Sequence, residues 1–421
     1  MKKMILVLFL LSSLIFQTTF ATDGYFRHGY GIKYSALAGS GVAVSLSSLG
    51  AITNPASIIH TNNSLEINFS VFSPMRDYTI TGNPSGFPQT FGLTPGKIES
   101  DKNIFFFPTI GLKRGIADNM AIALSIYGNG GMNTDYPAQT FYESSSPNTG
   151  VNIEQMFANL SYAIEVTKGH SLGIAAMFGW QRFAAKGLVA FSPFSSDPAN
   201  LSGNSWSTST GFGFKVGYQG MLTEWLSVGA AYQSKMNMSE FERYAGLFAE
   251  KGDFDIPASW AAGVAVSPTK DWTFLVDVKQ ILYSGVKSVN NPLLPNIQTS
   301  QLGKDDGAGF GWKDITAVKF GVMYKAIENY TLMAGYSYNE NPIKESEVLF
   351  NILAPAVIQN HITAGVTRKI SEDSDLTLAF MYALNNSVKG ANPLEAPGQQ
   401  SIEISMRQWQ IEVGYSFCLI K

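Results

Sequence analysis

Four lysines have the position and chemistry to bind an anion. Each interrupts a segment in which apolar and polar residues alternate, so its side chain points away from the apolar face. These lysines are Lys215, Lys235, Lys279 and Lys319. An ammonium group there could bind the carboxylate of an acidic substrate, or it could pair with a carboxylate on the same face such as Asp277 or Glu412. The sequence leaves both interpretations open.

No residue pattern in the chain indicates catalysis or a metal site. Hydrolysis would need a serine beside a histidine, and the histidines are His28, His60, His170 and His361. Only His361 lies in an alternating segment, where a single histidine is usually structural. Cys418 is the only cysteine, so neither an intrachain disulfide nor a cysteine metal site can form. We expect no enzyme activity, metal or cofactor, and the net charge of −3 gives no reason to expect nucleic acid.

Two other groups of residues could have a function. The segment 76–100 carries Phe87, Phe91 and Leu93, which could form an apolar capture groove or simply pack a loop. The run Gly128-Asn129-Gly130-Gly131 ends an alternating segment. Glycine inside a strand marks a bend or a bulge and weakens pairing with the next strand. The alternative is that these glycines begin a loop.

The first 21 residues have the pattern of a secretory signal peptide. Lys2 and Lys3 precede the apolar run 4–16, and Thr19-Phe20-Ala21 is a suitable cleavage site. The alternative, a transmembrane anchor, would need about 20 apolar residues. We therefore expect an exported protein whose mature chain begins at Thr22.

Apolar and polar residues alternate from Ser64 to the C-terminus, as in strands that have one apolar face. Fourteen such segments are predicted: 64–72, 103–113, 119–128, 151–166, 171–183, 206–221, 225–238, 256–267, 271–283, 313–325, 330–340, 359–370, 376–388 and 402–417. In the last segment the apolar residues change faces near Arg407, which indicates either a bulge there or a misplaced boundary of the segment.

Short and long connections alternate between these segments without exception. The long ones are 73–102, 129–150, 184–205, 239–255, 284–312, 341–358 and 389–401. Outer-membrane barrels have this arrangement, with tight periplasmic turns and long outer loops, whereas a soluble all-β fold has no need of it. The sequence therefore predicts an all-β protein, a 14-stranded antiparallel transmembrane β-barrel over 64–417, with a C-terminal extension over 418–421.

The segment 22–63 has neither helical nor strand periodicity. It is rich in Gly, Ala and Ser and ends on Asn54-Pro55-Ala56 and a short polar stretch. A barrel of fourteen strands must hold either water or a plug, and its predicted inward residues are small, which leaves room for a plug. We predict that 22–63 forms an N-terminal hatch, a plug inside the barrel. The alternative is an unpacked periplasmic tail.

The mature chain resembles the FadL/TodX family of outer-membrane transporters for long-chain fatty acids and other hydrophobic molecules. The resemblance rests on GYFRHGYGIKYSALAGSGVA near the N-terminus, on TNPAS at 53–57, on GNGGMNTDY at 128–136 and on the strand pattern. It implies a hatch based on Asn54-Pro55-Ala56, capture by outer loops, an apolar lumen site and sideways release beside a kink at 128–131. It does not identify a carboxylate-binding residue.

These patterns together predict a passive outer-membrane transporter for hydrophobic small molecules in a Gram-negative cell. We expect a monomer surrounded by outer-membrane lipid, whose C-terminal strand is bound by the barrel-assembly machinery. Two alternatives remain at this stage: a general diffusion porin, and an adhesin or structural barrel.

Overall fold

The barrel closes on itself through fourteen antiparallel wall strands. The computed structural model describes residues 23–419, so the predicted signal peptide and the end of the predicted C-terminal extension lie outside the described residues. The wall strands are β1 (Ser64–Thr81), β3 (Phe105–Ala117), β4 (Met120–Asn133), β5 (Gly150–Thr167), β6 (His170–Lys186), β7 (Ser207–Thr223), β8 (Leu226–Gln233), β10 (Ser259–Val266), β11 (Trp272–Ile281), β12 (Ile315–Tyr324), β13 (Tyr330–Asn339), β14 (Asn360–Ser371), β15 (Ser374–Ala391) and β16 (Ser401–Cys418). Each pairs with its neighbours in order, and β16 pairs with β1. The predicted fold class is confirmed.

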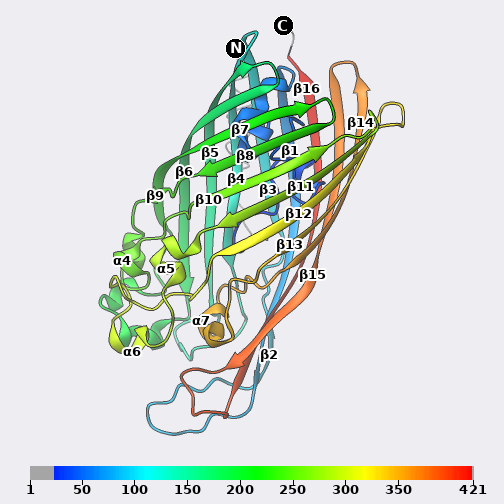
Figure 1. Cartoon of the computed structure of the whole chain (residues 1–421). Coiled ribbons are helices and arrows are strands. Elements are labelled where there is room, and N and C mark those ends of the chain that lie inside the picture. The colour runs from blue at the N-terminus through cyan, green and yellow to red at the C-terminus, as the bar shows by residue number, and fades with distance from the viewer. Residues whose placement is uncertain (1–22, 420–421) are drawn as a thin grey trace.

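The two ends of the barrel differ, as Figure 1 shows. The end of β16 and the short turns lie at one end, the turn end; the long connections gather at the other, the loop end. Two short strands in the long connections extend the sheet: β2 (Gly96–Glu99) pairs with β1, and β9 (Asn237–Met238) pairs with β7. None of the helices among residues 23–419 is long and apolar enough to span a membrane.

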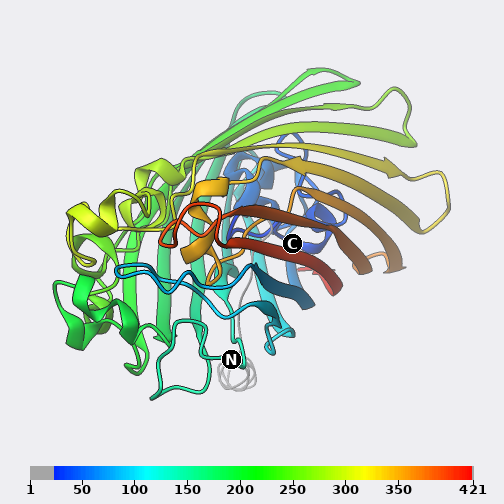
Figure 2. The same cartoon turned by 90° about the horizontal axis from the view of Figure 1, so that it is seen from below.

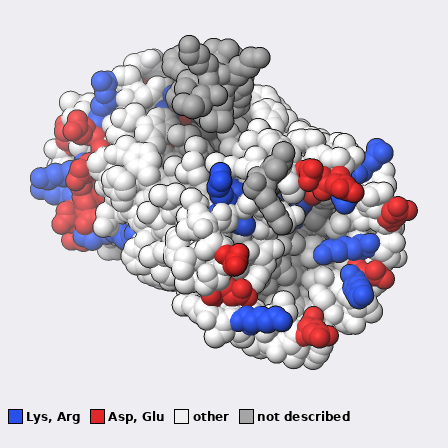
Figure 3. Space-filling model, turned by 90° about the horizontal axis from the view of Figure 1, so that it is seen from above, with Lys and Arg blue, Asp and Glu red and all other residues white. Residues whose placement is uncertain are grey.

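Side chains on the wall alternate between an apolar outer face and a mostly polar inner face. On β16, Ile411, Val413 and Tyr415 are exposed, whereas Gln410 and Glu412 are buried in the lumen. Figure 3 shows the consequence, a broad uncharged zone between groups of charged residues. An outward band of apolar side chains is what a lipid-facing barrel requires.

The bulge predicted near Arg407 is wrong. Strand β16 pairs with β1 without a shift over its whole length, and the register shift lies in the neighbouring strand β15, between Ala383 and Asn386. Ile402 and Ile404 face inward like Gln410, and both belong to the large apolar core at the loop end. The inner face therefore changes from polar to apolar along the barrel, and this change imitates a bulge in the sequence.

Several predicted strand boundaries also need correction. Strand β1 runs nine residues past the predicted end at 72, and β4 continues through its glycines to Asn133. The predicted strand 225–238 is divided into β8 and β9. In the extension of β1 the outward residues Asp77 and Thr79 are polar and the inward residues Tyr78 and Ile80 are apolar and buried, so the apolar residues change faces and the pattern of 64–72 does not continue.

Short helices fold the long connections into a compact cap at the loop end (Figure 1). These are η2 (Val189–Phe194), η3 (Pro198–Asn200), η4 (Glu242–Tyr244), α4 (Ala249–Gly252), η5 (Tyr283–Gly285), α5 (Lys287–Asn290), α6 (Asn296–Thr299), η6 (Glu345–Glu347) and α7 (Val348–Asn351). Their aromatic and aliphatic side chains continue the apolar core of the lumen at the loop end.

The N-terminal segment lies inside the barrel, as the view along the lumen in Figure 2 shows. It contains α2 (Ile32–Ser35), α3 (Gly50–Thr53) and η1 (Pro55–His60). Most of its residues are buried, and the Asp277 carboxylate of β11 accepts hydrogen bonds from two of its backbone amides, Gly41 at 2.7 Å and Val42 at 2.9 Å. The predicted plug is therefore part of the folded lumen.

Asn54, Pro55 and Ala56 attach the base of this segment to the wall. The amide of Asn54 donates to the carbonyl oxygens of Val42 at 2.8 Å and Tyr218 at 2.9 Å, and its oxygen accepts from the Ala56 amide at 3.0 Å. Glycine in the wall makes the contact possible, because a Cβ at Gly217 would lie 2.0 Å from Asn54 Oδ1. Small inward residues thus allow backbone to pack against backbone.

Replacing Asn54 with alanine should loosen the base of the plug without unfolding the barrel. The variant leaves buried backbone groups unpaired, at a cost of about 2 kcal/mol, so hydrogen-exchange protection of the Ala56 and Ser57 amides should fall by roughly 30-fold. Asn62→Ala is the control, because Asn62 is exposed. Equal protection in the two variants would contradict this attachment.

Candidate functional site

The wall has a gap between β3 and β4. Their pairing reaches Thr109 opposite Tyr127 and stops, although β3 continues to Phe105 and β4 continues to Asn133. On its other edge β4 remains paired with β5, with a register shift between Gly128 and Gly130. The edge of β4 from Gly128 onward therefore has no partner in β3.

The N-terminal segment takes the place that β3 leaves open. Phe26 forms an antiparallel bridge with Gly130. The Gly131 amide donates to the Tyr25 carbonyl oxygen at 2.9 Å, and the Arg27 amide donates to that of Asn129 at 3.3 Å. A Cβ at Gly130 would lie 1.8 Å from the Tyr25 oxygen. Glycine is therefore required for the segment to close the gap.

Aromatic rings surround the segment at this point. The Tyr25 ring packs on Phe26, Phe254, Tyr283 and Trp312, with centroids 4.9 to 6.0 Å apart. All of these side chains are buried. The closed gap thus joins the apolar core directly.

Asn129 connects the gap to the hatch through side chains as well. Tyr30 of the hatch donates to its side-chain oxygen at 2.8 Å, and the Asn129 amide donates to Gln155 of β5 at 3.0 Å. All four residues predicted from the glycine run, Gly128 to Gly131, therefore lie at the gap, and Asn129, Gly130 and Gly131 contact the hatch.

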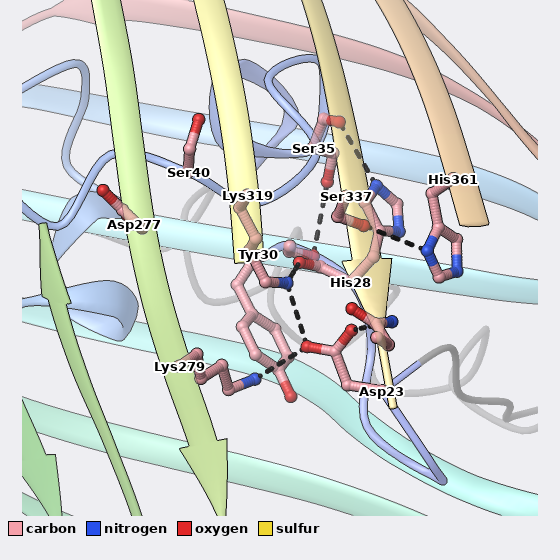
Figure 4. Close-up of polar contacts among 12 residues, drawn as sticks. Asp23, His28, Tyr30, Ser35, Ser40, Asp277, Lys279, Lys319, Ser337 and His361 are labelled. Carbon is pink, nitrogen blue, oxygen red and sulfur yellow. Dashed lines mark hydrogen bonds and ion pairs between the residues drawn. The ribbon is translucent and has the colours of Figure 1, made fainter. Parts of the chain in front are cut away.

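Two of the predicted lysines meet a single carboxylate in the lumen. Figure 4 shows Asp23 between Lys279, 3.1 Å away, and Lys319, 2.9 Å away. Asn339 donates to the other carboxylate oxygen at 2.9 Å. Burial alone would raise the pKa of Asp23, but the two ammonium groups outweigh it and hold that pKa well below its ordinary value. Asp23 is therefore ionised and fixes the N-terminal segment to β11 and β12.

The other two predicted lysines lie apart from this pair. The Lys215 ammonium is buried and donates to the Ile52 carbonyl oxygen of the hatch. Lys235 lies at the loop end, where it pairs with Asp255 at 2.6 Å. The structure brings Lys215, Lys279 and Lys319 to one lumen cavity of about 60 Å³, and Lys235 does not line it.

The predicted capture residues also do not all lie together in the structure. Phe87 is 65% exposed at the tip of its loop, whereas Leu93 is buried. The ring of Phe91 packs against Phe141 and Phe191. Leu93 and Phe91 thus belong to the apolar cap, and Phe87 points away from it.

The cap also holds an apolar pocket that the sequence did not reveal. Its volume is about 30 Å³. Its lining includes Phe183, Phe191, Phe248, Phe310, Phe350 and Leu353. Phe183 lies on β6 and the others come from four different long connections, so no local spacing links the whole set; the frequency of phenylalanine in those connections was the available signal.

His28 of the N-terminal segment is buried beside a second histidine. Its Nε2 lies 3.2 Å from the Ser35 carbonyl oxygen, and its ring stacks on His361 of β14 with centroids 5.8 Å apart. Burial, and then the neighbouring charges of His361 and Lys319, hold the pKa of His28 well below its usual value. His28 is therefore neutral in the closed protein.

When the segment is released from the lumen, the pKa of His28 returns toward its ordinary value, so the released segment binds a proton more readily than the closed one. Closure should therefore weaken as the pH falls below about 6.5. Protection of the Gly131 amide, corrected for intrinsic exchange, should decrease by up to tenfold per pH unit. His28→Gln should reduce this slope, and Asp23, whose pKa is held below its ordinary value, should add nothing above about pH 4. The same slope in both proteins would contradict the role of His28.

Comparison with known proteins identifies one family. The family described as "outer membrane protein transport protein (OMPP1/FadL/TodX)" matches residues 31–407. No curated protein matches the chain significantly. The P. putida toluene transporter TodX has a similar structure, with 18% identity, a TM-score of 0.67, and coverage of 94% of this chain and 99% of that one.

Two further solved structures have the same fold. A Pseudomonas aeruginosa FadL homologue is 14% identical, with a TM-score of 0.69 and coverage of 94% and 99% of the two chains. The Ralstonia pickettii toluene transporter TbuX is 16% identical, with a TM-score of 0.64 and coverage of 93% and 99%. The family match and the closed fourteen-stranded barrel agree, and the chain belongs to the FadL/TodX family of outer-membrane transport proteins.

Proposed function

We propose that this protein carries hydrophobic small molecules, long-chain fatty acids or hydrocarbons, across the outer membrane and releases them sideways between β3 and β4. The pairing of residues 25–27 with the edge of β4 carries the proposal. A backbone segment that fills a missing strand can leave without breaking the rest of the wall. The gap then joins the lumen to the membrane.

The cap at the loop end supports capture of an apolar molecule. Its pocket is lined almost entirely by apolar side chains, including Phe191 and Phe350. Each methylene buried there contributes roughly 0.8 kcal/mol, so a chain of sixteen carbons could gain on the order of 10 kcal/mol. The present volume of about 30 Å³ requires the loops to open further around such a ligand.

Sideways release solves the problem that tight apolar binding creates. A molecule that is stabilised by burial leaves slowly into water, but it loses little when it passes into lipid. The described wall exposes the apolar side chain of Phe106 on β3, next to the gap. Lipid at this surface is the proposed acceptor, and the two solved toluene transporters support hydrocarbons as one class of cargo.

A general diffusion porin is the weaker alternative. Such a channel needs a continuous water-filled lumen, whereas residues 23–58 occupy this one and leave a cavity of about 60 Å³ among them. We accordingly expect no swelling of liposomes containing the protein when sugars are added outside. Rapid swelling would favour the porin.

Filling the gap should stop uptake. In Gly130→Trp the side chain displaces residues 25–27 from the edge of β4 and itself occupies the gap, so uptake of radiolabelled hexadecanoate or hexadecane by cells should fall at least tenfold. Gly285→Trp is the matched control, since a Cβ at Gly285 meets no atom within 4 Å. Heat-modifiable mobility on gels checks that both barrels are folded. Normal uptake by folded Gly130→Trp would exclude exit through this gap.

A further inference from the structure

The carboxylate of Asp23 lies in a position that would suit the carboxylate of an acidic cargo molecule. Both lysines and Asn339 direct N–H groups at it, and none of its surface is exposed. Two ammonium groups and an amide are a complete set of donors for a fatty-acid carboxylate. The chain's own N-terminal segment fills this site in the closed protein.

The surroundings of Asp23 carry an excess of positive charge. The adjoining cavity of about 60 Å³ is lined by Lys215, Lys279 and Lys319, and by one carboxylate, Asp277. That carboxylate already accepts from two hatch amides. Among residues 23–419, Lys215 forms no ion pair and donates to a backbone carbonyl instead. The cavity therefore favours an additional anion.

The same cavity reaches the gap. Asn129 and Tyr30, which hold the hatch to β4, are part of its lining, together with Phe26. Asp23 precedes Tyr25 by only two residues, and its backbone is hydrogen-bonded to Phe26 at 2.8 Å. If Asp23 moves away from the lysines, the pairing of residues 25–27 with β4 must therefore break as well.

We propose that Asp23 is an internal competitor for the carboxylate of the cargo: an acid bound at Lys215, Lys279 and Lys319 displaces Asp23, and this displacement frees residues 25–27 from β4. The inference rests on the proposed function and adds to it a substrate class and a trigger. An uncharged molecule of the same length lacks the group that competes. The protein therefore distinguishes acids from hydrocarbons at the step that opens the gap.

Binding tests this with two matched probes, hexadecanoate and hexadecan-1-ol, and the full-length protein in detergent. Hexadecanoate should lower hydrogen-exchange protection of the Gly131 and Arg27 amides at least tenfold, and hexadecan-1-ol should change it less than twofold. In Asp23→Asn the protection should already be low without ligand. The two amides report directly on the bonds that close the gap.

Removing a cation should act on the acid alone. Lys279→Met and Lys215→Met should weaken hexadecanoate binding at least tenfold and hexadecan-1-ol binding less than twofold. Lys33→Met is the control, because Lys33 pairs with Asp375 at 3.3 Å and does not line the cavity. If a single lysine variant does not fold, the double variant Asp23→Asn/Lys319→Met takes its place in the test, because it removes both charges of one ion pair.

The outcomes separate this inference from the proposed function. If both probes bind alike and the lysine variants affect them alike, Asp23 is a structural anchor and the inference is wrong. If cells still take up both probes and Gly130→Trp blocks that uptake, the proposed function, transport with sideways release, stands without the inference about Asp23. If uptake is unaffected by Gly130→Trp while hexadecanoate alone displaces Asp23, the site stands and the exit route is wrong.

Discussion

A strand edge inside a membrane must find hydrogen-bond partners, and this constraint governs the structure. Lipid offers no donors or acceptors, so an unpaired edge costs several kcal/mol for each backbone group. The part of β4 from Gly128 onward would be such an edge, because β3 pairs with β4 only as far as Thr109. Residues 25–27 supply the missing partners from inside the lumen. The barrel is complete only while its plug is in place.

The rest of the lumen holds that short segment in position. Asp23 is fixed by Lys279 and Lys319 on one side of it, and Arg27 pairs with Glu412 of β16 at 2.8 Å on the other. Each ion pair is buried, where loss of one partner leaves an uncompensated charge. Contacts of this kind hold the segment firmly, and they fit the proposed displacement of Asp23 by a competing charge.

Alternation and loop lengths predicted the barrel because lipid and lumen impose opposite polarities on successive residues. Prediction failed where that contrast disappears: Ile402 and Ile404 face an apolar lumen, and their alternation therefore imitates a bulge that β16 does not have. The glycines at 128–131 indicated the place of the gap, but not the partner that fills it. Asp23 and Phe350 could not be found from sequence, since each acquires its role from residues hundreds of positions away.

The structure of this protein with a long-chain fatty acid bound tests the central claim most directly. The account predicts that residues 25–27 have left β4 and that an opening runs between 105–108 and 128–131 from the lumen to the outer wall. A ligand-bound protein in which Phe26 still pairs with Gly130, and in which an opening leads instead to the turn end, would contradict it.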